Sequence, residues 1–194
     1  AAGPDGSWPP AGVTLFDGAV HDPLRRVPDT VGTAEVVSIK AGDNVVAAWP
    51  SFLPDGKHFL FVTTDNLGPK QLGVGTLDSA ETVMLGPIAS RAEYAAGRIF
   101  YVAQNTLVSR PFSLQSLAFT GEATPVASDT LQVEPSGRTD VSVSVAGHLA
   151  YVAAPAQQRG GLVWIDRSGR EIGPVGEPGL YTDIDLSRDD SRAV

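Results

Sequence analysis

The chain contains no cysteine, and this absence excludes several kinds of site at once. Without thiols there can be no disulfide bond, no thiolate nucleophile and no cysteine-based zinc site. Long apolar runs are missing too, since none approaches the ~20 residues of a membrane-spanning helix. The first residues show no basic stretch followed by an apolar core, so we expect neither a signal peptide nor a membrane span in this chain.

Positive charge is scarce in this sequence. The 14 lysines and arginines are outnumbered by 22 aspartates and glutamates, which gives a formal net charge of −8. An acidic surface repels the phosphate backbone of nucleic acids. We therefore expect no nucleic-acid partner.

Residues suited to catalysis or metal binding are also few. The three histidines, His21, His58 and His148, show no metal-ligand spacing, and no Gly-x-Ser-x-Gly nucleophile motif occurs. Alternate acidic residues between Asp183 and Asp189 resemble a calcium loop, but the loop glycine and the terminal glutamate are missing. We therefore expect no catalytic residue, no metal, no cofactor and no enzymatic activity in this chain.

The sequence is rich in turns. It has 21 glycines and 15 prolines, and a short turn pattern returns five times along the chain. The last residues of these turns are Gly12, Gly56, Gly97, Gly147 and Asp190, at intervals of 44, 41, 50 and 43 residues. A period of roughly 40 to 50 residues built from short strands is typical of propeller blades.

We therefore predict an all-β fold, namely a β-propeller fragment of about four four-stranded blades plus part of a fifth. The repeats are expected at about 7–45, 46–90, 91–135, 136–179 and, incomplete, 180–194. Because the chain stops inside an expected strand at Val194, we expect the remaining blades to belong to a larger parent protein. A ring of only four blades, closed by its own termini, is the alternative.

The second repeat shows the expected blade most clearly. A first strand over 49–53 enters a tight turn, in which Pro54 presets φ, Asp55 caps the turn and Gly56 takes a positive φ. Three further strands are expected over 57–64, 70–77 and 81–85. Equivalent strands are expected over 13–16, 24–27 and 34–39 in the first repeat, over 99–102, 106–112 and 123–127 in the third, and over 140–145, 149–152, 161–165 and 171–175 in the fourth.

Three segments resemble a known family of repeats. The run from Trp49 to Phe61 resembles the TolB-like, or WD40-like, β-propeller repeats found C-terminal to the kinase domain of bacterial serine/threonine protein kinases. Residues 106–112 with 117–126 are similar to the next repeat of that family, and residues 162–169 with 175–176 and 179–181 are similar to the one after. The resemblance implies an extracytoplasmic sensor or interaction domain, periplasmic or extracellular. The first turn, Pro-Pro-Ala-Gly at 9–12, and the last, which lacks glycine, depart from the pattern.

The candidate partner-binding residues lie at or just before the first strand of each blade, the strand that lines the central channel of a propeller. These residues are Trp49, Glu93, Asp140 and Asp183. Because three of them are carboxylates, we expect a channel mouth with a negative potential. A cationic or neutral partner, whether a protein, a peptide or a small molecule, would fit that mouth.

Three kinds of function are open to such a chain. The first is a non-enzymatic binding or sensing module, either in a receptor-type kinase or as a TolB-like periplasmic interaction protein. The second is a propeller that gates substrates for a separate hydrolase domain of the prolyl-oligopeptidase type. The third is a purely structural role.

Overall fold

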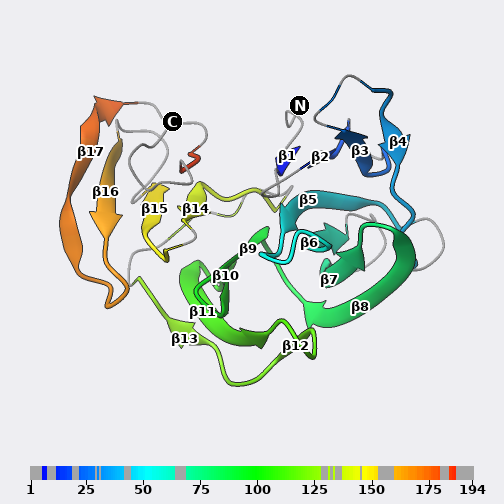
Figure 1. The fold of residues 1–194 in the computed structure, drawn as a ribbon. Coiled ribbons are helices and arrows are strands. Elements are labelled where there is room, and N and C mark those ends of the chain that lie inside the picture. Colours follow the sequence, from blue (N-terminus) through cyan, green and yellow to red (C-terminus); the bar gives the residue numbers. More distant parts are fainter. Residues whose placement is uncertain are drawn as a thin grey trace. The chain divides into compact units, whose positions relative to one another are not determined.

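A computed structural model shows only strands, turns and irregular segments in the part of the chain that it describes (Figure 1). The described residues are 6–7, 12–18, 22–28, 30, 32–41, 45–63, 69–127, 131, 133, 137–144, 146–152, 160–179 and 184–186. Among them, no helix is long and apolar enough to cross a membrane.

The strands form four sheets, and each sheet takes all its strands from one continuous stretch of the chain. Sheet I contains β1 (Gly6–Ser7), β2 (Val13–Phe16), β3 (Arg25–Pro28) and β4 (Glu35–Val36). Sheet II contains β5 (Ala47–Phe52), β6 (His58–Thr63), β7 (Gln71–Thr76) and β8 (Ser79–Pro87). Sheet III contains β9 (Ala92–Ala95), β10 (Arg98–Ala103), β11 (Thr106–Ser113), β12 (Ala118–Phe119) and β13 (Thr124–Pro125). Sheet IV contains β14 (Val141–Val143), β15 (Leu149–Val152), β16 (Gly160–Ile165) and β17 (Glu171–Gly179).

Antiparallel pairing of neighbouring strands in sequence order confirms the predicted all-β fold built from propeller-type blades. Sheet III differs in one detail, because two short strands, β12 and β13, take the place of the single outer strand expected over 123–127. Between them, the carbonyl of Gly121 accepts a hydrogen bond from Arg110 Nε at 2.8 Å, and the backbone of Thr120 donates to Pro111 O at 3.0 Å. The chain is thereby drawn into a turn that interrupts the outer strand.

The chain divides into two compact units. The first comprises Ala1–Ala92 with Leu114–Ala118, and the second comprises Glu93–Ser113 with Phe119–Val194. Sheets I and II belong to the first unit, and sheet IV with most of sheet III belongs to the second. In each unit, one apolar core joins the two successive sheets. The buried residues of the core are Leu15, Leu24, Val37, Ala47, Phe59 and Phe61 in the first unit, and Ala95, Phe100, Val102, Leu107, Leu131, Val141, Leu149, Tyr151 and Ile165 in the second.

Two phenylalanines of β6 are packed over two glycines of β7. Phe59 is paired with Gly75 and Phe61 with Gly73, and both rings are fully buried. A Cβ on Gly75 would come within 2.4 Å of the Phe59 ring, and one on Gly73 within 2.3 Å of the Phe61 ring. The glycines are therefore required because the rings occupy the space where their side chains would lie.

The turns that follow the first strands have the predicted backbone. Gly12, Gly56, Gly97 and Gly147 all have positive φ, between +65° and +94°. The fifth predicted turn, ending at Asp190, lies outside the described residues, as does Val194. From the last repeat only 184–186 are described, and Ile184 is buried against Ala150 and Leu162 of sheet IV.

Candidate functional site

The first strand of sheet II carries a backbone irregularity at Trp49. Ala48 is paired with Val62 and Ser51 with Leu60, so that two residues of β5 oppose one of β6 in a bulge. Trp49 has a φ of +52°, a left-handed conformation that costs a residue with a side chain about 1–3 kcal/mol. Its backbone amide donates to Asp17 Oδ2 at 3.0 Å, and both residues are 8% exposed. A buried carboxylate directly after β2 thus supports the unusual conformation of Trp49.

Glu93 lies in β9, the first strand of sheet III, and it is half-buried. Its Oε2 accepts a hydrogen bond from the backbone amide of Val143 in β14 at 2.7 Å. A similar bond occurs in the first unit, where Ser7 Oγ in β1 accepts from the amide of Phe52 in β5 at 2.9 Å. In both units, therefore, a side chain of one first strand accepts a backbone hydrogen bond from the next first strand.

Asp140 immediately precedes β14 and is half-buried. Its carbonyl accepts from the amide of Val152 in β15 at 3.1 Å, which fixes the start of the strand. Val143, the residue that Glu93 binds, follows Asp140 by three positions, or about 10 Å along an extended strand. Glu93 and Asp140 thus belong to neighbouring first strands of the second unit.

The other two predicted site residues are placed differently. Trp49 belongs to the first unit and is buried, so its contacts are those of the core and of Asp17. Asp183 lies outside the described residues. Their role in partner binding stays a prediction, as does that of Glu93 and Asp140.

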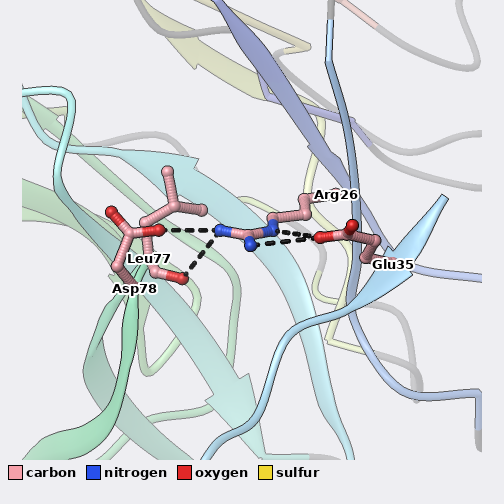
Figure 2. A network of polar contacts seen from close by, with 4 residues as sticks. All are labelled: Arg26, Glu35, Leu77 and Asp78. Carbon is pink, nitrogen blue, oxygen red and sulfur yellow. Dashed lines mark hydrogen bonds and ion pairs between the residues drawn. The ribbon is translucent and has the colours of Figure 1, made fainter. Parts of the chain in front are cut away.

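A polar network joins sheets I and II at the turn between β7 and β8 (Figure 2). Arg26 of β3 lies between two carboxylates, with Nη1 2.8 Å from Asp78 Oδ1 and Nη2 3.1 Å from Glu35 Oε2. Nη1 also donates to the carbonyl of Leu77 at 3.4 Å. The hydrogen bond to Asp78, followed by that to Glu35, raises the pKa of Arg26 above its ordinary value. Sequence analysis did not single out this network, because its partners are 52 and 9 residues from Arg26 in the chain.

The side chain of His58 contacts the carboxylate of Asp55 in the preceding turn. Its Nδ1 lies 2.6 Å from Asp55 Oδ2, while Asp55 Oδ1 accepts the backbone amides of Lys57 and His58, each at 2.9 Å. Burial alone would raise the pKa of Asp55, but these hydrogen bonds, led by that of the His58 side chain, outweigh it and lower the pKa below its usual 3.8. Asp55 therefore caps the turn, as the sequence predicted. His21 lies outside the described residues.

Metal ligands do not gather in the described residues, since no three His, Asp or Glu side chains there lie close enough together to hold an ion. Asp183 and Asp189, on which a calcium loop would depend, are not among those residues. Asp185 is described, and its Oδ1 accepts from the amide of Leu186 at 2.9 Å.

No protein-family model and no curated protein match the sequence. Solved structures do match the fold. TolB from Acinetobacter baumannii superposes with a TM-score of 0.67 at 17% identity over 94% of this chain. A calcium-binding protein, regucalcin, from Agrobacterium tumefaciens superposes with a TM-score of 0.67 at 14% identity over 97% of this chain. A prolyl endopeptidase superposes with a TM-score of 0.53 at 14% identity over 94% of this chain.

Identities this low show the fold alone, which is that of β-propeller blades. The chain spans 45% of the TolB chain, 65% of the regucalcin chain and 28% of the prolyl endopeptidase chain. Its neighbours include both a hydrolase and proteins without a hydrolase name, so that the fold by itself is compatible with several functions.

Proposed function

We propose that this chain is part of a non-enzymatic β-propeller that binds or senses a partner as the extracytoplasmic module of a larger bacterial protein. The observation that carries the proposal is the likeness to TolB, a bacterial protein, over 94% of this chain. The resemblance of residues 49–61 to the propeller repeats of bacterial receptor-type kinases supports the same setting. A periplasmic location follows from the proposal.

The partner would bind at the end of the blades where the first strands begin. Asp140 lies at that end of β14, whereas Glu93 binds Val143 at the other end of the same strand. Since the Glu93 carboxylate already accepts the amide of Val143, we assign it a positioning role and assign contact with the partner to Asp140. A carboxylate at this point favours a cationic or neutral group on the partner.

A photoreactive amino acid placed at position 140 tests this location directly. The matched control carries the same group at Ile172 on the outer strand β17, which is 59% exposed. We expect position 140, but not position 172, to form a specific adduct in a bacterial envelope extract, and we expect unlabelled chain to compete for it. Absence of an adduct, or the same adduct from both positions, would contradict the proposed location.

The likeness to a prolyl endopeptidase favours a second candidate, a propeller that gates substrates for a separate hydrolase domain. The gene on either side of this segment distinguishes the two. A Gly-x-Ser-x-Gly region followed by an aspartate and a histidine would support the gate. A kinase signature with one membrane helix would support the sensing module.

A further inference from the structure

The second unit contains a cavity of about 410 Å³ between sheets III and IV. Two arginines line it, Arg98 from β10 and Arg167 from the turn between β16 and β17. Hydroxyl groups and buried apolar side chains complete the wall, among them Ser109, Phe100 and Leu149. Among the described residues that line it there is no aspartate or glutamate, so their fixed charge is positive in a chain whose net charge is −8.

Arg98 is positioned by its neighbours but not neutralised. Its Nε donates to Ser109 Oγ at 2.9 Å, and its Nη2 donates to Ser109 O at 3.0 Å and to Thr124 Oγ1 at 2.9 Å. All three acceptors are uncharged. Within the described part of the chain, no ion pair involves Arg98 and its Nη1 has no protein acceptor. The guanidinium is therefore fixed in orientation with one donor group available.

Arg167, like Arg98, is bound by an uncharged acceptor. Its Nη2 donates to the carbonyl of Ala146, an uncharged acceptor. The neighbouring carboxylate, Asp166, is bound within its own turn, where it accepts the amides of Ser168 at 2.9 Å and Arg170 at 3.1 Å. The Ser168 hydroxyl, followed by the Arg170 amide, lowers the pKa of Asp166 to about 2. Among the residues that the structure describes, no carboxylate is paired with Arg167.

The same place in the first unit holds an ion pair. His58 and Leu149 each follow a turn glycine by two residues and are paired with Thr76 and Ile165 on the next strand. Thr76 and Ile165 are therefore equivalent. Asp78 follows Thr76 by two residues and Arg167 follows Ile165 by two, so Asp78 in the first unit corresponds to Arg167 in the second.

The facing residues correspond as well. Arg26, paired with Leu15, corresponds to Ser109, paired with Phe100, since Leu15 and Phe100 each follow a turn glycine by three residues. Asp78 binds Arg26 in the first unit. The second unit has an arginine in place of that aspartate, and Arg98 is bound to the facing serine. The cavity thus contains two cations at a junction where the other unit contains one cation bound by two carboxylates.

We propose that this cavity binds a small organic anion whose carboxylate or phosphate group takes the place that the Asp78 carboxylate occupies in the first unit. Arginine donors form strong charge-assisted hydrogen bonds with both groups. An anion would also relieve the repulsion between the two guanidinium groups. The apolar body of the ligand would pack against Phe100 and Leu149, which are buried in the wall. This site lies at the opposite end of β14 from Asp140, so it is separate from the proposed partner site.

Calorimetric titration of the 194-residue chain with benzoate and with inorganic phosphate at low salt tests the proposal. We expect saturable binding of at least one probe, and the preferred probe identifies the anionic group. Arg167→Gln should weaken binding about tenfold, because a charge-assisted contact is lost. Arg170→Gln is the matched control: it removes the same charge from the same turn, at a residue that does not line the cavity. It should leave binding unchanged.

Arg167→Asp sharpens the test, because it puts an aspartate at the position that Asp78 has in the first unit. The new carboxylate would line the same cavity as Arg98, and it should abolish binding of both probes while leaving the melting temperature unchanged or raised. Three results would overturn the proposal: no binding of either probe to the parent chain, equal weakening by Arg167→Gln and Arg170→Gln, or full binding by Arg167→Asp.

Discussion

Sheets II and IV can be compared through the residue pairs between their second and third strands. In sheet II the bulky residue of a pair lies on the second strand, and in sheet IV it lies on the third. In sheet II, Phe59 and Phe61 of the second strand are paired with Gly75 and Gly73 of the third. In sheet IV, Ala150 and Val152 occupy the second strand, and their partners are Trp164 and Leu162. The large residue has changed strand, yet each pair still combines a larger with a smaller side chain. The comparison suggests a rule that can be tested, namely that bulk on one strand of a cross-strand pair is accompanied by a smaller residue on the other.

The polar positions of the two units differ in the same way. The residue before the turn glycine is Asp55 in sheet II, where its side chain caps the turn. In sheet IV it is Ala146, whose carbonyl binds Arg167, and the cap comes from Ser144 Oγ, which accepts the amide of His148 at 3.1 Å. The junction beside it has Asp78 in the first unit and Arg167 in the second. A common backbone therefore supports a junction closed by an ion pair in one unit and a positively charged cavity in the other.

The largest effect is expected when a buried aromatic ring of sheet II is removed. Phe59→Ala deletes a fully buried ring and should reduce the free energy of unfolding by about 3–5 kcal/mol, as measured by urea denaturation. Ile172→Ala in β17, where the side chain is 59% exposed, is the control and should change it by about 0.5 kcal/mol or less.

Compensation from the facing strand tests the volume argument itself. Gly75→Leu in the Phe59→Ala background would supply bulk from the third strand, as Trp164 does in sheet IV. We expect the double variant to be more stable than Phe59→Ala alone. If Gly75→Leu destabilises both backgrounds equally, the two sheets do not follow a common volume rule.

A smaller loss is expected from a single methyl group at the same place. Gly75→Ala would put a Cβ 2.4 Å from the Phe59 ring and should cost about 1–3 kcal/mol. Gly161→Ala in β16 is the matched control, since no atom lies within 4 Å of its would-be Cβ. Thermal or urea unfolding of both variants gives the result, and equal losses would show that strand propensity and not packing is responsible.

The Asp55 cap in the turn of sheet II should make the free energy of unfolding depend on pH in the acid range. Asp55→Ala puts the residue of the Ala146 position into sheet II without the Ser144 cap of sheet IV, and it should cost about 1 kcal/mol near neutral pH. Because the folded pKa of Asp55 lies below its ordinary 3.8, this contribution is present above that value and is lost as the pH falls through the folded pKa. Unfolding measured from about pH 6 to about pH 2 should show the two proteins converging at the acid end. A constant difference across the range would contradict the assignment.

The smallest effect is expected at the surface ion pair. Asp78→Asn leaves Arg26 bound to Glu35 and should cost about 0.2–1 kcal/mol, less at high salt. Urea unfolding at low and high salt measures both values. A loss independent of salt would indicate that the Asp78 contact acts through packing and not through charge.

Sequence analysis predicted the repeat because the turn residues act locally. Pro54, Asp55 and Gly56 each have a backbone preference that is independent of the rest of the fold, and the strands follow directly from the spacing of such turns. The interruption between β12 and β13 was missed, since it depends on a hydrogen bond from Arg110 to a carbonyl 11 residues away. The left-handed backbone of Trp49 was missed for a similar reason, because its support, Asp17, lies directly after a strand of the preceding sheet.

The predicted binding residues were chosen by position in the blade, and position alone does not indicate what a side chain contacts. Glu93 illustrates this, because its carboxylate binds the backbone of the next sheet. The arginine cavity was not predicted at all. A signal for it does exist in the sequence, since alignment of the repeats on their turn glycines places Asp78 and Arg167 at equivalent positions. Only the structure shows that both positions lie at a junction between sheets.

The hydrogen bonds between successive first strands have a consequence for how the number of blades can change during evolution. Each sheet takes its described strand pairs from one segment of sequence, and Ser7 and Glu93 each accept a backbone hydrogen bond from the first strand of the following sheet. A gene duplication of one such segment would therefore add a complete blade, attached through its apolar face and through one acceptor side chain four or five residues before the turn glycine. Variation in blade number among proteins of this architecture would then require no redesign of the blades already present.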